Sequence, residues 1–191
     1  MIFDFRRDIT VMEPLMIKNE VVELTDEYKY LGMTIDNKFN WDRNLEAITR
    51  KANQRLYFLR KLKSFRVDKK IMNIFYTSSI QSLISFGIIC YGGNLNMSHI
   101  KKLNRIIKNA SQIMNSHNRS FFELYNDATS KKANTILEDT NHPLHSEYIK
   151  STRSHRLLSK KARTDRYKNS FIPTSTRLLQ QNTPRTPKSP T

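Results

Sequence analysis

Apolar and polar side chains alternate in the first part of the chain. Between residues 27 and 36 the alternation predicts one β-strand, because successive side chains of a strand point to opposite faces. Asp36, Asn37 and Lys38 then supply the chemistry of a turn. Gly32 interrupts the strand, and a glycine at such a place often marks a bulge or the close approach of another backbone.

Two further strand signals come before this stretch. Residues 15–17 and 21–24 are apolar runs separated by a turn-forming segment at 18–20, which together predict a hairpin. Residues 1–5 alternate briefly and predict a third short strand. Strands this short are marginal by themselves, so we expect them to need the helices that follow.

Helical periodicity begins after Asn40, which we expect to cap the first helix. Apolar residues recur at spacings of three and four up to about residue 64, which predicts an amphipathic helix with one buried stripe. The predicted stripe consists of Leu45, Ile48, Ala52, Leu56, Leu59 and Leu62. Tyr57 and Phe58 fall outside it, among basic residues.

Two more helices are predicted. Asp68 is expected to cap a buried helix that ends near Gly87, and Ser98 is expected to cap a third helix that runs to about residue 114. The residues expected to be buried in the second helix are Ile71, Ile74, Phe75, Leu83 and Ile84. The stripe of the third helix consists of Ile100, Leu103, Ile106, Ile107, Ala110, Ile113 and Met114.

The remaining chain is less regular. Short helices are predicted at 121–125 and 131–138, residues 150–168 are basic and poorly periodic, and residues 180–191 are expected to be a disordered proline-containing tail. The fold class is therefore expected to be α+β and mainly α. Its expected parts are a β-rich piece (1–39), a helical bundle (40–115), short helices with basic loops (116–179) and the tail (180–191).

The charge is distributed unevenly. The chain of 191 residues has a net charge of +16 at pH 7, from 33 Lys and Arg against 17 Asp and Glu. Residues 1–39 carry −3, so the chain after residue 39 carries +19. A field of this sign attracts polyanions, and nucleic acid is the commonest polyanion inside cells. The simpler alternative is a solvated basic surface without a partner.

Cysteine use and the N-terminal sequence indicate the compartment. The single cysteine, Cys90, allows no disulfide, which suits a reducing environment. Arg6 and Arg7 follow the short apolar start instead of preceding it, so the pattern of a signal peptide is not met. We therefore expect an intracellular protein, cytoplasmic or nuclear, and these patterns leave its oligomeric state open.

One apolar stretch raises the question of a membrane. Residues 71–98 contain no Asp, Glu, Lys or Arg, a length that would permit a membrane span. Polar side chains interrupt the run, namely Asn73, Thr77, Ser78, Ser79, Gln81, Ser82 and Ser85. Such groups are costly in lipid, so we favour a buried helix and expect no membrane contact.

Residues for catalysis form no recognisable set. The four glycines give neither GxGxxG nor GxxxxGK. His142 and His145 are a close pair, but the proline between them disfavours a regular helix and no cysteine or carboxylate cluster accompanies them. No Asp-Asp pair is present to hold two metal ions. We expect no metal, no cofactor and no enzyme activity from this chain alone.

The candidates for phosphate contact are cations on the first and third predicted helices. Backbone phosphates need only positive side chains on a rigid element, so spacing is not diagnostic here. The candidates are Arg43, Arg50, Lys51, Arg55, Arg60, Lys101, Lys102, Arg105 and Lys108.

Several segments, in order, resemble the C-terminal part of reverse transcriptases from non-LTR (LINE-type) retrotransposons. The sequence YKYLG at 28–32 is similar to their primer-grip hairpin, and KANQRLYFLRKL at 51–62 is similar to their first thumb helix. The other similar segments are 1–7, 39–41, 74–92 (similar to the next thumb helix and its loop), 103–110, 132–133, 139–145, 163–164 and 170–173.

The resemblance implies a thumb and tail that would grip a template–primer duplex, with Tyr30 and Gly32 near the primer backbone. The family's fingers, its palm with the catalytic aspartates and its endonuclease match nothing in this chain, and Cys90 stands where the family more often has tryptophan. We therefore expect a catalytically incomplete piece that binds RNA or an RNA–DNA hybrid without sequence specificity. A degenerate retroelement relic without molecular function is the alternative.

A second resemblance covers a shorter stretch. Residues 52–76 are similar to the short N-terminal domain of AlkB homologue eight, a tRNA-modifying dioxygenase and methyltransferase. Neither activity is implied for this chain, because the sequence contains no His-x-Asp iron motif and no glycine-rich cofactor loop.

Overall fold

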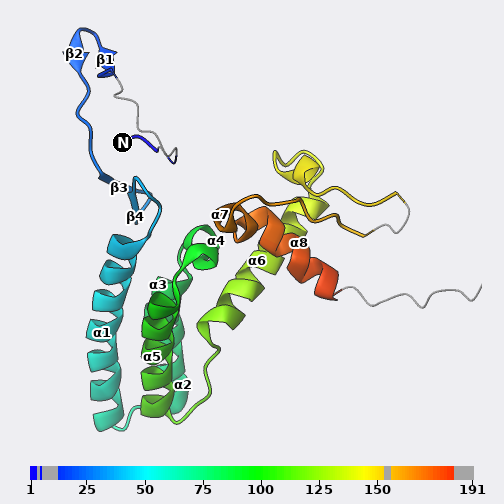
Figure 1. The fold of residues 1–191 in the computed structure, drawn as a ribbon. Helices are drawn as coiled ribbons and strands as arrows, with labels where there is room; N and C mark the ends of the chain where they lie inside the picture. Colours follow the sequence, from blue (N-terminus) through cyan, green and yellow to red (C-terminus); the bar gives the residue numbers. More distant parts are fainter. Residues whose placement is uncertain (4, 6–12, 153–155, 183–191) are drawn as a thin grey trace, which may run out of the picture.

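Two small β-hairpins precede a set of helices in the computed structural model, which describes residues 1–3, 5, 13–152 and 156–182. The predicted fold class, α+β and mainly α, is confirmed. Figure 1 shows the first hairpin far from the helices and the second beside the start of the longest helix.

The first hairpin is shorter than its sequence pattern predicted. β1 (Met16–Ile17) pairs with β2 (Glu20–Val21), and Lys18 and Asn19 form the turn with positive φ angles. Every residue of these two strands is exposed. The strand predicted at residues 1–5 is wrong for the part that the structure describes. Phe3 instead stacks on Phe39 with ring centroids 4.5 Å apart.

The stretch at 27–36 is a second hairpin, so the prediction of one continuous strand is wrong. β3 (Glu27–Tyr30) pairs with β4 (Met33–Asp36), and the chain reverses at Leu31 and Gly32. Both turn residues have positive φ, 46° and 86°, the geometry that matches the twist of two-residue hairpins and favours glycine. Apolar and polar side chains alternate along both β3 and β4. The alternation therefore does not show that the chain turns back between the two strands.

Asp36 organises the passage from this hairpin into α1 (Asp42–Ser64). Its carboxylate accepts hydrogen bonds from the backbone N–H groups of Lys38, Asn40 and Trp41, all at 3.0–3.1 Å. The residue before the helix is Trp41, at φ 66°, so the prediction that Asn40 caps this helix is wrong. The indole of Trp41 is buried and directs the chain into the core.

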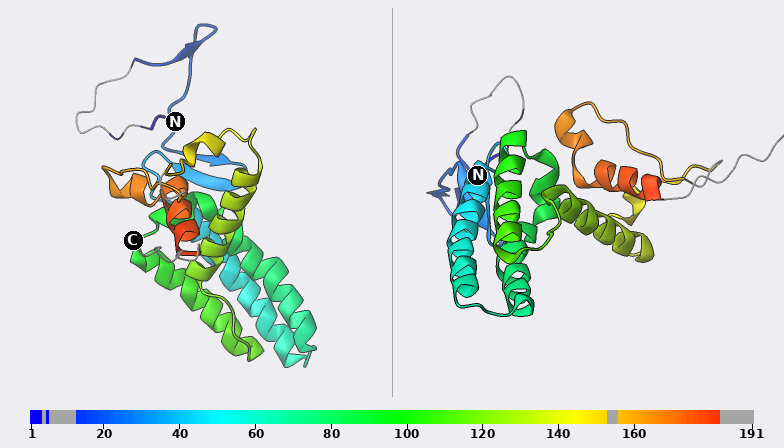
Figure 2. Two further views of the ribbon diagram at one scale, coloured as in Figure 1. Left: turned by 90° about the vertical axis from the view of Figure 1, so that its right-hand side faces the viewer. Right: turned by 90° about the horizontal axis from the view of Figure 1, so that it is seen from below.

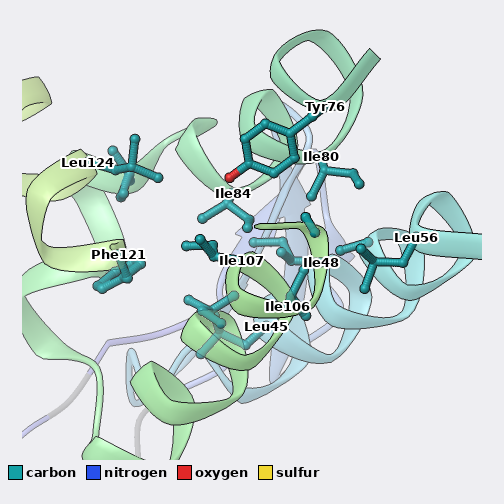
Figure 3. Packing of buried hydrophobic residues seen from close by; sticks show 14 of the residues in the cluster. Leu45, Ile48, Leu56, Tyr76, Ile80, Ile84, Ile106, Ile107, Phe121 and Leu124 are labelled. Atoms are coloured by element: carbon teal, nitrogen blue, oxygen red, sulfur yellow. The ribbon is translucent and has the colours of Figure 1, made fainter. Parts of the chain in front are cut away.

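A bundle of three helical segments holds the main core. α2 (Lys69–Phe75), the π-helical η1 (Tyr76–Gln81) and α3 (Ser82–Ser85) form one continuous helix, which packs with α1 and α5 (Met97–Met114). α1 and α5 are parallel neighbours in Figures 1 and 2. The side chains that meet among the three helices include Ile48, Leu56, Ile80, Ile84, Ile106 and Ile107, shown in Figure 3.

The buried stripe of the second helix differs from its prediction. Ile84 is buried as predicted, and Met72, Tyr76 and Ile80 are buried without having been predicted. Ile71 and Ile74, predicted to be buried, are 55% and 66% exposed, and Phe75 and Leu83 are half-buried. Both sets recur at helical spacing, and only the direction of the neighbouring helices decides between them. The apolar composition of the segment predicted a helix that packs in the core, but it did not predict which side of that helix is buried.

Residues 86–96, which include Gly87, Gly92 and Gly93, join this helix to α5. Asp68 caps α2 as predicted, accepting from the Lys70 N–H at 2.7 Å, but Asn96 rather than Ser98 caps α5. Two short helices, α4 (Ile88–Tyr91) and η2 (Gly92–Asn94), lie between α3 and α5. Gly87 has φ 66°, and a Cβ there would lie 2.1 Å from the Met33 sulfur, so the second hairpin packs directly against this loop.

The C-terminal part forms a second, smaller core on one long helix. α6 (Phe121–Glu138) is continuous where two short helices were predicted. A capping box between Ser120 and Glu123 starts it, and Thr129 is fully buried in its middle. Polar residues in the middle of α6 weaken the helical periodicity of the sequence, but tertiary packing keeps the helix continuous. α8 (Phe171–Asn182) crosses α6 (Figure 1).

Between α6 and α8 the described residues include two short helices, η3 (His145–Glu147) and α7 (Asp165–Lys168), and an isolated antiparallel bridge between Lys150 and Leu157. A hydrogen bond of 2.7 Å between the hydroxyls of Tyr148 and Ser175 joins the segment after η3 to α8. Residues 180–182 belong to α8, so the disorder predicted for them is wrong, and the rest of the predicted tail lies outside the described residues.

Candidate nucleic-acid interface

The outward face of α1 carries cations and aromatic rings. The stripe that faces the bundle ends at Leu59, and the opposite side of the helix presents Arg43, Arg50, Lys51, Tyr57, Phe58 and Lys61, all exposed. Glu46 is the single acidic residue between Arg43 and Ser64. Residues seven apart lie nearly above one another on a helix, so Tyr57 follows Arg50 and Phe58 follows Lys51.

α5 adds a second row of cations. Its buried stripe runs from Ile100 to Met114, and Lys101, Arg105 and Lys108 lie on the opposite, exposed side. Lys102 is displaced from this row toward α1 and lines a pocket shared by the two helices. The predicted cations of the first and third helices are therefore brought onto neighbouring, parallel elements.

A pocket of about 470 Å³ lies between the N-terminal halves of α1 and α5. Arg50 and Asn53 line it from α1, and Lys102 and His99 line it from α5. The imidazole Nε2 of His99 lies 2.9 Å from a carboxylate oxygen of Asp42, a contact that joins the first turns of both helices. Asp42 and Glu46 also line this pocket, so its charge is mixed.

A smaller pocket, of about 310 Å³, lies farther along the same pair of helices. Arg60 and Lys63 line it from α1, and Asn109, Gln112 and Ile113 line it from α5. None of the described residues that line this pocket carries a carboxylate. The two pockets place Arg50 and Lys102 near one end of the α1–α5 pair and Arg60 near the other end.

Most of the predicted cations have no carboxylate partner among the described residues, whereas Arg43 forms ion pairs. Among the described residues, no carboxylate pairs with Arg50, Lys51, Arg60, Lys101, Lys102, Arg105 or Lys108. Arg43 lies 3.5 Å from Glu27 and 3.6 Å from Glu46, both in exposed pairs. Such pairs are weak and screened by salt, so they leave Arg43 able to exchange partners.

Arg55 has a different role from the other candidates. Its guanidinium is half-buried and donates a hydrogen bond to the backbone carbonyl of Ser79 in the π-helical η1. This hydrogen bond from a charged donor joins α1 to the second helix. The structure therefore gives Arg55 a packing role that its position in the basic sequence run did not indicate.

Tyr30 and Gly32 lie on the second hairpin, at the N-terminal end of α1. The turn accounts for Gly32 by itself, and a Cβ there would come within 3.4 Å of the Phe86 ring. Tyr30 is exposed and lines an apolar hollow of about 630 Å³ together with Leu31, Met33 and Tyr167. Neither residue belongs to the pockets between α1 and α5.

Two titratable side chains favour their neutral forms: Tyr76, which is buried in the core, and Cys90, which is exposed. Burial raises the pKa of the Tyr76 phenol to about 12 and also raises the pKa of the Cys90 thiol, so both remain protonated near neutral pH. Within the described residues, no group of three or more His, Cys, Asp or Glu side chains is arranged to hold a metal ion. The arrangement therefore offers cations and aromatic rings for binding.

The described chain contains one helical stretch long and apolar enough to cross a membrane, Lys69–Asn94, whose most apolar 18-residue window has a mean hydropathy of 1.3. Of its most apolar window, 28% is buried inside the protein. The hydroxyls of Thr77 and Ser78 bond to the carbonyls of Asn73 and Ile74 in their own helix. Core helices of soluble proteins meet the same criteria of length and composition, so these alone do not assign a membrane role.

The fold and the basic helix pair define a small, mainly helical protein with a cationic face. Comparison with known families adds one similarity: the model of the family "Alkylated DNA repair protein alkB homolog 8, N-terminal" matches residues 41–82. The match covers α1, α2 and η1, including the exposed Tyr57 and Phe58. No curated protein and no solved structure matches the chain.

Tyr57 and Phe58 were not among the predicted binding residues, although their position outside the apolar stripe marked them as exposed. Their seven-residue spacing from Arg50 and Lys51 was a usable signal, because it places an aromatic ring on the same helical face as a cation, two turns further along. His99 and Asn53 were also missed, since nothing in the sequence shows that α1 and α5 are neighbours.

Proposed function

We propose that this chain is a nucleic-acid-binding module that holds the phosphates of RNA or an RNA–DNA hybrid along α1 and α5, without catalysis. The observation that carries the proposal is the parallel packing of these helices, with Arg50 and Lys102 lining one pocket. Backbone phosphates repeat at regular intervals, and rows of cations on two rigid, parallel elements suit such a ligand.

The net charge after residue 39 supports the proposal in a second way. A charge of +19 on about four-fifths of the chain steers polyanions toward it from a distance, although this effect is unspecific and screened by salt. The family whose model matches residues 41–82 is described as the N-terminal part of an alkylated DNA repair protein. We propose no transfer of that protein's activity to this chain.

The finer form of the proposal is a reverse-transcriptase thumb. It rests on the ordered segments similar to non-LTR reverse transcriptases and on the helices that those segments form here. In this form the preferred ligand is an RNA–DNA hybrid, and Tyr30 and Gly32 of the second hairpin would lie beside the primer strand. A hybrid bound no better than RNA duplex of the same length would count against the thumb but leave the coarser proposal intact.

The test of the coarser proposal is the affinity of the full chain for labelled RNA and for an RNA–DNA hybrid, measured against salt concentration. We expect the affinity to fall about a thousandfold or more between roughly 50 and 200 mM salt, the loss produced by several phosphate contacts. A flat salt dependence, or no binding at low salt, would refute the proposal.

A further inference from the structure

The two exposed aromatic residues of α1 point to the form of nucleic acid that this face accepts. Tyr57 and Phe58 are 54% and 55% exposed, although large aromatic side chains usually find cover. Their rings lie 5.7 Å apart at 72°, an edge-to-face contact that gives the two rings different orientations. α1 has a fully formed buried stripe on its other side, so the core does not need these rings.

The surroundings of the two rings are cationic. The Nζ of Lys61 lies 5.8 Å from the centroid of the Tyr57 ring. Arg50 and Lys51 precede the rings by seven residues, on the same side of the helix. The described chain places no carboxylate in an ion pair with Arg50, Lys51 or Lys61. A neutral apolar partner would leave these charges without compensation, so charge complementarity selects an anionic ligand.

An anionic ligand that also presents flat aromatic faces is a single-stranded nucleic acid. In a duplex the bases stack on one another and their faces are covered, so exposed aromatic side chains gain nothing from it beyond groove contacts. In a single strand each base offers a π-face, and proteins hold such strands by combining cations for the backbone with aromatic rings for the bases. The alternation of Arg50 and Lys51 with Tyr57 and Phe58 along α1 matches this combination.

We propose that Tyr57 and Phe58 form a stacking platform for unpaired bases of RNA, flanked by Arg50, Lys51 and Lys61, which hold the adjoining phosphates. The proposal rests on the proposed nucleic-acid function and specifies single-stranded RNA as the ligand of this outward face of α1. Stacking removes Lys61 from the face of Tyr57, and the displaced ammonium contacts the phosphate beside the stacked base. No base-edge readout is involved, so the platform accepts different sequences.

The decisive variant is the double change Tyr57→Leu with Phe58→Leu in the full chain. Leucine keeps the apolar surface and the helix propensity but removes the rings. The matched control is Phe122→Leu, which changes a 46% exposed phenylalanine on α6, outside the basic face of α1. Lys61→Gln is a second control, because it removes a charge and keeps both rings. Circular dichroism and thermal unfolding establish that all three variants fold like the parent.

Three probes separate the contributions: an oligouridylate of about 16 nucleotides, an RNA duplex of the same length, and inorganic polyphosphate as a polyanion without bases. We expect the double variant to lose roughly 5- to 150-fold in affinity for oligouridylate, the range for one stacked base, and to bind duplex and polyphosphate like the parent. Phe122→Leu should change none of the three affinities, and Lys61→Gln should weaken all three by a similar factor.

Two results would overturn the inference. If the double variant binds oligouridylate like the parent while binding remains salt-dependent, the platform is refuted and the coarser nucleic-acid function stands. If it loses affinity for polyphosphate as much as for oligouridylate, the rings contribute through the fold and not by stacking. Failure of the parent to bind any of the probes would refute the proposed function itself, which is a different outcome.

Discussion

The Nε2 of His99 lies 2.9 Å from the Oδ1 of Asp42, and this contact joins the first turn of α1 to the first turn of α5. The two residues are 57 positions apart in sequence, and the imidazole is largely buried while the carboxylate is half exposed. The pair sits at the edge of the pocket that Arg50 and Lys102 also line. It therefore fixes how the two cation-bearing helices align.

The first prediction concerns the energy of this pair. Asp42→Ala, His99→Ala and the double variant form a cycle that isolates the interaction, and we expect a coupling of about 0.5–1 kcal/mol in the free energy of unfolding, as for a partly exposed pair. Urea unfolding of the four proteins measures it. A coupling of zero would mean that the close contact does not hold the helices together.

The second prediction separates two arginines of α1 that lie five residues apart, Arg50 and Arg55. Arg50→Ala should leave stability within about 0.5 kcal/mol and reduce the salt slope of nucleic-acid binding by about one, the effect of one lost phosphate contact. Arg55→Ala should destabilise the fold by about 1.5–3 kcal/mol, since it breaks a charged hydrogen bond to Ser79, and leave the slope unchanged. Urea unfolding and salt titrations of both variants give the comparison, and the reverse pattern would contradict the assignment.

The third prediction tests the phase of the second helix. Ile80 is fully buried between α1 and α5, so Ile80→Ala should cost about 2–5 kcal/mol in the free energy of unfolding. Ile74 is 66% exposed, and Ile74→Ala should change stability by no more than about 0.5 kcal/mol. The midpoints of urea unfolding report both values. Equal losses would show that Ile74 is covered in solution.

The fourth prediction concerns alkaline pH. Burial raises the pKa of Tyr76 from 10.0 to about 12, so between these values the unfolded chain releases a proton that the folded chain retains. The contribution of Tyr76 to the free energy of unfolding should therefore be fully present below pH 10. Between pH 10 and about 12 it should fall by about 1.4 kcal/mol per pH unit. Tyr76→Phe should remove that part of the slope, as measured by urea unfolding across the same range.

The Tyr76 variant has a matched partner in Tyr91. Among the described residues the buried Tyr76 hydroxyl has no hydrogen-bond partner, whereas the Tyr91 hydroxyl donates to the Ile84 carbonyl. At neutral pH, Tyr76→Phe should be neutral or stabilising, and Tyr91→Phe should cost about 0.5–1.5 kcal/mol. A similar loss from both would indicate that Tyr76 also makes a hydrogen bond.

The fifth prediction distinguishes a folded binding module from a relic that does not fold. Amide hydrogens of α1 and α5 should exchange slowly, because both helices surround the main core. Those of the exposed first hairpin, β1 and β2, should exchange quickly and serve as the internal reference. Unprotected exchange from residue 42 to 114 would favour the relic.

Part of this architecture can be read from the sequence for a physical reason. A helix with one buried side repeats apolar residues at spacings of three and four, so the stripes of α1 and α5 were predicted almost residue by residue. Asp68 was identified as a cap because its side chain acts on the backbone two residues away. Local chemistry of this kind acts within one turn and is visible in one stretch of sequence.

Predictions that depend on a second stretch of chain were less secure. Leu31 and Gly32 form a turn only because β4 returns along β3, and Ile71 is exposed only because its neighbours lie on the other side of the helix. The continuity of α6 through Thr129 likewise depends on packing that buries this residue. Each of these outcomes is set by a partner that the local pattern does not contain.

The sequence by itself determined the fold class, the two main amphipathic helices and the excess of positive charge, because composition and periodicity are properties of single segments. Tertiary structure decided which cations are available: it turned Arg55 inward to Ser79 and brought Arg50 and Lys102 to one pocket. It also left Tyr57 and Phe58 uncovered. Whether a side chain faces solvent, the core or another helix depends on how helices pack, and that is a relationship between distant parts of the chain.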